Sequence, residues 1–114
     1  MLKYRIVLIP FPFDDLHASK VRPAVCLCEP KGAFKHVIVA FISSRIPPVR
    51  LESDLLIDAG RPDFNVTGLK VASTIRLHRL MTVPVSAIVR ELGCIPDDKV
   101  SEIRLKLNRL FELD

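Results

Sequence analysis

Tryptophan is absent from this sequence and tyrosine occurs once, so phenylalanine is the main aromatic side chain available for stacking on a ligand. Long apolar runs are also missing. The longest, Ile6–Pro12 and Val37–Ile42, are far shorter than the ~20 residues that a membrane-spanning helix needs. No secretory leader is visible, because Met1–Tyr4 leads directly into strand-like sequence. We therefore expect a cytoplasmic protein.

The cysteines are too few to form a disulfide framework, since there are only three and the count is odd. Cys26 and Cys28 are two residues apart in a strand-like run, so they point to the same face and are expected to be small buried apolar groups. Cys94 and three scattered histidines do not supply the spaced ligands of a metal site. We predict neither a metal nor a cofactor.

The composition is that of an ordinary folded protein, with 49% hydrophobic and 26% charged residues. Repeats, low-complexity stretches and linkers are missing, which predicts one domain over residues 1–114. The net charge of +4 favours polyanionic partners but leaves the function open, because many small basic proteins bind no nucleic acid.

Segments rich in β-branched and aromatic residues dominate the chain and predict strands. They are Tyr4–Phe11, Val21–Glu29, Lys35–Ser43, Leu55–Asp58, Leu69–Arg76 and Arg79–Val83. Lys35–Ser43 lacks polar alternation, which indicates burial on both faces. Pro84–Leu92 is expected to form a short helix that Gly93 ends.

The C-terminal segment predicts an amphipathic helix. Asp97 and Asp98 follow Pro96, which suits an N-cap and first turn. Apolar residues then recur at helical spacing, at Val100, Ile103, Leu107, Leu110 and Phe111. Five or six short strands and this helix predict a mainly β fold, a small and strongly bent β-barrel.

Three blocks of the sequence, in order, resemble the MazF/PemK family of toxins from type II toxin–antitoxin systems. The first is Ile6–Pro23, an apolar strand that leads through a Pro/Phe/Asp segment to an Arg-Pro pair. The second is Ala40–Ser44, a strand that ends on serine, and the third is Gly68–Val83. Arg90–Gly93 and the terminal helix resemble the C-terminal part of the family's sequences. The resemblance implies an SH3-like barrel, a homodimer, a cognate antitoxin with an acidic extended tail, and metal-independent, sequence-specific cleavage of single-stranded RNA.

The resemblance also implies a catalytic group of Arg22, Ser43 and Arg76. In metal-independent RNA cleavage the 2′-hydroxyl attacks the adjacent phosphate, and a guanidinium is well suited to bind the charged phosphate oxygens. A serine hydroxyl can hydrogen-bond the same group. Without the resemblance, Arg22 would be interpreted as a solvated edge arginine and Ser43 as a strand-end turn residue.

Two histidines are further candidates for this catalytic group. In the Kid-like branch of the family an acid follows the arginine by two residues and a histidine comes from the first loop. Here His78 stands in place of the acid, and His17 lies near the loop histidine. Two imidazoles could divide the base and acid work, whereas an isolated histidine is more often structural.

Residues expected to bind the RNA backbone are Lys20, Ser44, Arg45, Arg50 and Arg79. Phe11, Phe13 and Phe64 are the candidates for base stacking, although at least one of them is expected in the core.

Two other functions remain open. A protein-binding toxin on the same fold, like CcdB, inhibits DNA gyrase and cleaves nothing. A degenerate member would bind only RNA or an antitoxin, and Tyr4-Arg5 in place of the family's usual Gly-Asp keeps that hypothesis open, as does His78. The presence of both Arg22 and Ser43 favours the ribonuclease, because a gyrase inhibitor has no use for them.

Overall fold

The computed structural model describes residues 1–11 and 20–113. The strands are β1 (Arg5–Phe11), β2 (Lys20–Cys26), β3 (His36–Ser43), β4 (Asp54–Ile57), β5 (Ser73–Pro84) and β6 (Arg90–Cys94). Two short 3₁₀ turns, η1 (Phe64–Thr67) and η2 (Val85–Ala87), and the helix α1 (Asp97–Leu110) complete the fold.

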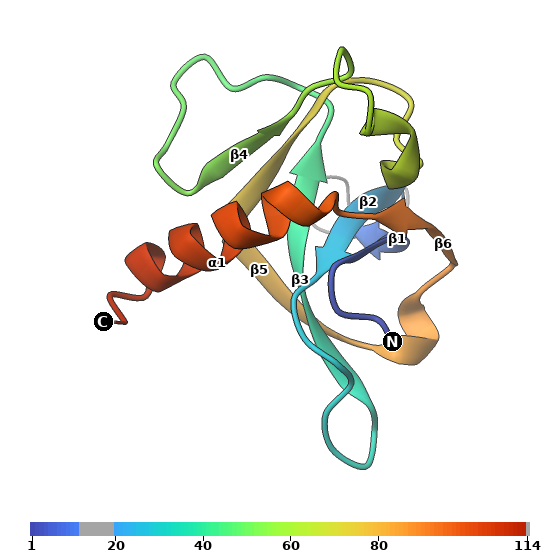
Figure 1. Ribbon diagram of the computed structural model, residues 1–114. Coiled ribbons are helices and arrows are strands. Elements are labelled where there is room, and N and C mark those ends of the chain that lie inside the picture. The colour runs from blue at the N-terminus through green and yellow to red at the C-terminus, as the bar shows by residue number, and fades with distance from the viewer. Residues whose placement is uncertain (12–19, 114) are drawn as a thin grey trace.

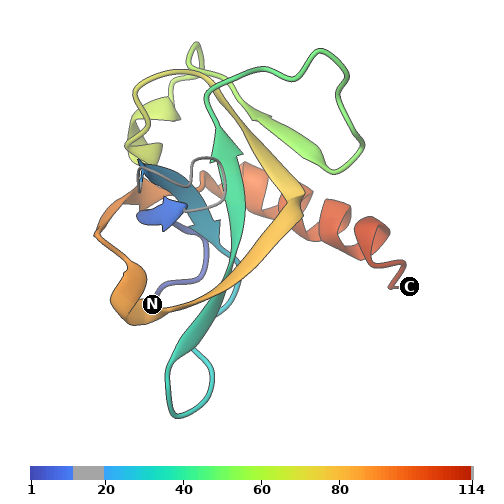
Figure 2. The same ribbon diagram turned by 180° about the vertical axis from the view of Figure 1, so that it is seen from behind.

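The six strands form one antiparallel sheet in the order β4-β5-β3-β2-β1-β6. The sheet curls into a half-barrel, and α1 crosses one of its faces (Figure 1). The opposite face is seen from behind in Figure 2. The predicted fold class, mainly β with a C-terminal helix, is confirmed. No helix in the described part of the chain is long and apolar enough to cross a membrane.

The sheet carries a hydrophobic cluster on each face. The cluster between the sheet and α1 consists of Ile6, Val25, Ala40, Ile42, Leu55, Ile57, Ile75, Leu77, Ile95 and, from α1 itself, Ile103. On the other face lie Val7, Ile9, Ala24, Cys26, Val37, Val39, Phe41 and Val83. Strand β3 supplies both clusters with alternate residues, which confirms the predicted burial on both faces and explains its lack of polar alternation.

Strand β5 contains a bulge where the sequence predicted a gap between two strands. Arg76 lies opposite Phe41 on β3, but the next pair joins Ala40 to Leu80. Residues 77–79 are therefore inserted into one side of the ladder, which bends the strand and increases its twist. The predicted start at Leu69 was wrong, since β5 begins at Ser73.

The helix expected at Pro84–Leu92 is not formed. Only Val85–Ala87 make a 3₁₀ turn, and β6 begins at Arg90. Gly93 does not end a helix but lies in β6 opposite Ile6. A Cβ at this position would be 2.1 Å from the carbonyl oxygen of Val66 in η1, so only glycine lets η1 approach β6 this closely.

Helix α1 starts after Pro96, which occupies the N-cap position without a side-chain capping hydrogen bond. Asp98 instead pairs with Arg61, with 2.6 Å between Oδ2 and Nη2. Ile103, on the face of the helix that packs against the sheet, is fully buried, as predicted. Phe111, the last apolar residue of the helical spacing, lies just beyond α1, which ends at Leu110, and its side chain is 52% exposed.

All three cysteines are free thiols. Cys26 is buried, and that burial raises the pKa of its thiol to about 11, which keeps it protonated and inert. Cys28 packs against the same cluster, which confirms the shared face, but it is only partly buried, so the predicted burial is confirmed for Cys26 alone.

Candidate active site

Arg22 lies in β2 opposite Ile9 of β1, and its side chain is partly buried. Pro23 follows it and points to the opposite face. The ladder between β2 and β3 starts only at Ala24, so the proline precedes the part of the strand that is paired on both sides. The Arg-Pro pair therefore fits the sheet at a position where the missing N–H costs least.

Ser43 is the last residue of β3 and lies opposite Thr74 of β5. Its Oγ accepts a hydrogen bond from the backbone N–H of Arg45 at 3.1 Å, which fixes the hydroxyl at the point where the chain leaves the strand. The Oγ1 atom of Thr74 is buried without a hydrogen-bond partner among the described residues. Two hydroxyls thus lie side by side on adjacent strands.

Arg76 forms an ion pair with Asp54, which lies opposite it at the start of β4. The Nε atom of Arg76 is 2.6 Å from Oδ1 of Asp54. The N–H does not point along this line, so the contact is an ion pair rather than a hydrogen bond. The Asp54 side chain is 0% exposed and that of Arg76 is 21% exposed, which places the carboxylate behind the guanidinium.

Strand register sets Arg22, Ser43 and Arg76 on one face of the sheet. Phe41 lies opposite both Ala24 and Arg76, and residues directly opposite one another share a face. Arg22 and Ser43 are each two residues beyond the Ala24–Phe41 pair, so they share that face too. The β2–β3 ladder ends at this pair, which puts both residues at the open end of these strands.

Arg79 also belongs to this face. Its Cζ atom lies over the Phe41 ring, 4.6 Å from the ring centroid. Leu80 pairs with Ala40, the neighbour of Phe41 on β3. Arg79, the last residue of the bulge, precedes Leu80 and therefore points to the same face as Phe41. His78 lies exposed within the same bulge.

The other predicted RNA-binding residues lie at a strand end or in a loop, and one of them, Ser44, lines a cavity on the opposite face of the sheet. Lys20 begins β2, and Ser44, Arg45 and Arg50 lie in the exposed connection after β3. Phe64 packs against the core under α1, so the structure gives it a core role. His17 and Phe13 lie outside the described residues, as does the side chain of Phe11.

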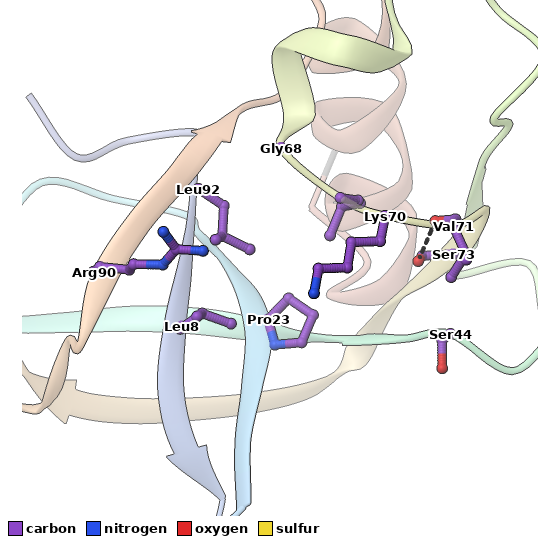
Figure 3. Close-up of a pocket in the computed structure, with 10 residues that line it drawn as sticks. Leu8, Pro23, Ser44, Gly68, Lys70, Val71, Ser73, Arg90 and Leu92 are labelled. Atoms are coloured by element: carbon purple, nitrogen blue, oxygen red, sulfur yellow. Dashed lines mark hydrogen bonds between the residues drawn. The ribbon is translucent and has the colours of Figure 1, made fainter.

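A cavity of about 260 Å³ lies on the other face of the sheet, near the same strand ends (Figure 3). Its lining consists of Leu8, Pro23, Ser44, Gly68, Leu69, Lys70, Val71, Ser73, Arg90 and Leu92. Lys70 extends toward Pro23, and Arg90 enters from β6 (Figure 3). The cavity is apolar with two cations, and it is separated from Arg22 by the sheet itself.

Sequence reasoning missed Asp54 and Thr74. Asp54 directly precedes the predicted strand Leu55–Asp58 and Thr74 lies inside the predicted strand Leu69–Arg76, and the partners of both are set by strand register. Among the described residues no three histidine, cysteine or acidic side chains form a group that could hold a metal ion. The site is a set of guanidinium and hydroxyl groups, which is suited to binding a phosphate.

Comparison of the structure with solved structures identifies the class of fold. The Mycobacterium tuberculosis toxin MazF-mt6 matches with a TM-score of 0.73 and 21% identity, over 96% of this chain and 98% of that one. A mycobacterial endoribonuclease in complex with its cognate antitoxin matches with a TM-score of 0.71 and 11% identity, over 100% of this chain and 97% of that one. At these identities the likeness shows the fold.

The family follows from the sequence itself. The family model for the PemK-like, MazF-like toxin of type II toxin–antitoxin systems matches residues 3–111, and the chain belongs to this family. A comparison with curated proteins finds no match. The resemblance in the three sequence blocks is thus confirmed at the level of family and fold.

Proposed function

We propose that this chain is a metal-independent endoribonuclease that cleaves single-stranded RNA. The observation that carries the proposal is the placement of Arg22, Ser43 and Arg76 on one face of the sheet. These groups come from three strands and lie at or near the strand ends, beside the exposed cations of the flanking connections. A phosphodiester bound there would meet guanidinium groups and a hydroxyl together.

In this reaction the 2′-hydroxyl attacks the adjacent phosphorus, and the 5′-oxygen of the next nucleotide leaves. Negative charge grows on the phosphoryl oxygens, and Arg22 and Arg76 stabilise it because guanidinium groups stay protonated. Ser43 donates a hydrogen bond to a phosphoryl oxygen. His78 and His17 are the imidazoles available to take up and return the proton.

We further propose that the chain acts as a homodimer in the cytoplasm and is inhibited by a cognate antitoxin. One similar structure is an endoribonuclease in complex with its cognate antitoxin. The net charge of +4 and the exposed cations near the site suit an acidic, extended segment as well as RNA. Such a segment would compete with RNA for the same cations.

The test is cleavage of a long RNA by the purified protein in excess EDTA, with Arg22→Ala and Arg104→Ala beside it. Arg104 is an exposed cation on α1, so its removal makes the same charge change away from the site. We expect discrete fragments that end in 2′,3′-cyclic phosphate. The cleavage rate should fall by about 100-fold or more in Arg22→Ala and stay near wild type in Arg104→Ala.

Intact RNA in the presence of folded wild-type protein would refute the ribonuclease. In that case the next assays are inhibition of DNA gyrase, for a CcdB-like toxin, and binding of uncleaved RNA, for a degenerate member. Equal loss in Arg22→Ala and Arg104→Ala would instead remove Arg22 from the catalytic group and leave the activity standing.

A further inference from the structure

We propose that Asp54 is a positioning residue that orients the Arg76 guanidinium for phosphate binding. The inference rests on the proposed ribonuclease function and adds a residue to it. The resemblance expects an acid at the position of His78, but His78 is exposed in the β5 bulge. In the structure the carboxylate beside Arg76 comes instead from β4, the neighbouring strand.

The Asp54 carboxylate is held on both sides. Oδ1 lies 2.6 Å from Nε of Arg76, and Oδ2 accepts a hydrogen bond from the backbone N–H of Leu51 at 2.9 Å. The backbone N–H of Asp54 donates in turn to the carbonyl of Leu51 at 3.0 Å. A fully buried carboxylate is costly unless it is paired, so these contacts leave it one stable orientation.

The turn that carries Asp54 is itself fixed to the rest of the fold. Nζ of Lys106 in α1 donates to the carbonyl of Glu52 at 2.7 Å, and Nη1 of Arg109 lies 3.4 Å from the Glu52 carboxylate. From the sheet side, the N–H of Leu77 in the bulge donates to the carbonyl of Ser53 at 3.3 Å. Contacts from α1 and from β5 therefore restrain the turn that carries the carboxylate.

The ion pair sets the direction of the Arg76 guanidinium. Nε is the nitrogen at the base of the planar group, so a carboxylate held 2.6 Å from it fixes where that base lies and limits where the two terminal nitrogens can reach. An arginine in solution has many rotamers, and holding it in one of them costs side-chain entropy. Because Asp54 orders Arg76 when the protein folds, RNA binding does not have to supply that entropy, and the guanidinium is preorganised.

The decisive variant is Asp54→Asn, which keeps the size of the side chain. Its Oδ1 can still accept the Leu51 hydrogen bond, but its –NH₂ group then faces the guanidinium, donor against donor. We expect the maximal cleavage rate to fall by about 10- to 100-fold, because a small misplacement of a charge-stabilising group has effects of this order. KM for RNA should be unchanged or lower, since the variant is more positive.

Asp58→Asn is the matched control, because it makes the same charge change at an exposed position just after β4. Its amide oxygen can keep the hydrogen bond from the N–H of Gly60. Asp54→Glu is a second variant that keeps the charge but displaces the carboxylate by one methylene. If Asp54→Asn does not fold, Asp54→Glu must still lower the maximal rate for the proposal to hold.

A double-mutant cycle with Arg76→Ala separates positioning from general stability. If Asp54 acts through Arg76, Asp54→Asn should lower the rate in the wild-type background and cause no further loss in the Arg76→Ala background. Equal losses in both backgrounds, or no loss in either, would overturn the proposal while leaving the ribonuclease standing. A wild-type protein that cleaves no RNA would overturn both, so the two failures are distinguishable.

Discussion

The guanidinium of Arg79 lies over the ring of Phe41, so a residue of the β5 bulge contacts the face of the sheet that carries Arg22, Ser43 and Arg76. Phe41 is 5% exposed and lies opposite both Ala24 and Arg76. A cation held over an aromatic ring near its centroid is stabilised by the ring's quadrupole. The edge of the guanidinium that faces away from the ring can still donate hydrogen bonds to a phosphate. Arg79 is therefore a charge held in place beside the proposed phosphate site.

Arg79→Ala should weaken RNA binding mainly through lost counterion release. For a non-cleavable 2′-O-methyl oligonucleotide, we expect the slope of log Kd against log salt concentration to decrease by about 1, the change that the loss of one phosphate contact causes. Fluorescence anisotropy over a salt series measures it. Arg104→Ala, on the outer side of α1, is the control and should keep the wild-type slope. Identical slopes for the two variants would show that Arg79 does not contact phosphate.

Ser43 and Ser44 are neighbours in sequence, but the strand alternation separates them. Ser43 shares a face with Thr74 and Arg76, whereas Ser44 lines the cavity on the other face. We expect Ser43→Ala to lower the maximal cleavage rate on the order of 10- to 100-fold, because the hydroxyl stabilises the charged phosphate. Ser44→Ala should leave the rate nearly unchanged in the same single-turnover assay.

The Ser43 hydroxyl also holds the backbone of Arg45, so a loss in Ser43→Ala could have a second origin. Ser43→Thr distinguishes the two, because it restores a hydroxyl that can serve both purposes. Recovery of the rate in Ser43→Thr, with equal thermal stability in all three variants, supports a direct role. A rate that falls equally in Ser43→Ala and Ser44→Ala would argue against it.

The strand pattern was predictable because β-branched residues and proline mark strands and their exits locally. The apolar run of Lys35–Ser43 even indicated burial on both faces, which β3 shows. The placement of Arg22 and Ser43 on one face of the sheet, beyond the last pair of the β2–β3 ladder, was not derivable from either residue alone. It came from the family resemblance, and strand register now supplies the physical reason.

The missed features all depend on contacts between distant segments. Asp54 meets Arg76 only because β4 pairs with β5 in one register, and no local signal marks an acid for that role. Gly93 follows a segment with helix-like composition, which suggested a helix stop. Its real constraint is the carbonyl of Val66 in η1, a contact that the sequence does not reveal.

Gly93→Ala should therefore destabilise the fold strongly. The new Cβ would lie 2.1 Å from one backbone carbonyl oxygen and 2.6 Å from the carbonyl carbon of Thr67, and neither backbone atom can move like a flexible side chain. We expect a loss of about 3 kcal/mol or more in urea unfolding, the upper range for overpacking. Gly60→Ala, whose Cβ would meet only the side chain of Asp58, should change stability by about 0.5 kcal/mol or less.

Glu29 fixes the N-terminal segment, and this contact predicts a pH dependence. Its carboxylate accepts hydrogen bonds from the backbone N–H groups of Leu2 at 2.8 Å and Lys3 at 3.2 Å. The bond from Leu2, then that from Lys3, together with the nearby positive charges, lowers the pKa of Glu29 below its usual 4.5. A lowered pKa in the folded state means that the unfolded state binds the proton more readily as the pH falls.

The stabilisation from Glu29 should thus be fully present above about pH 5 and be lost as the pH falls through the folded-state pKa. Glu29→Gln cannot ionise, so it should be less stable than wild type at pH 7, and the difference should shrink by pH 3. Urea unfolding at both pH values measures this, with Glu112→Gln, an exposed carboxylate after α1, as the control. A difference between wild type and Glu29→Gln that is the same at pH 7 and pH 3 would show that the charge of Glu29 does not stabilise the N-terminal segment.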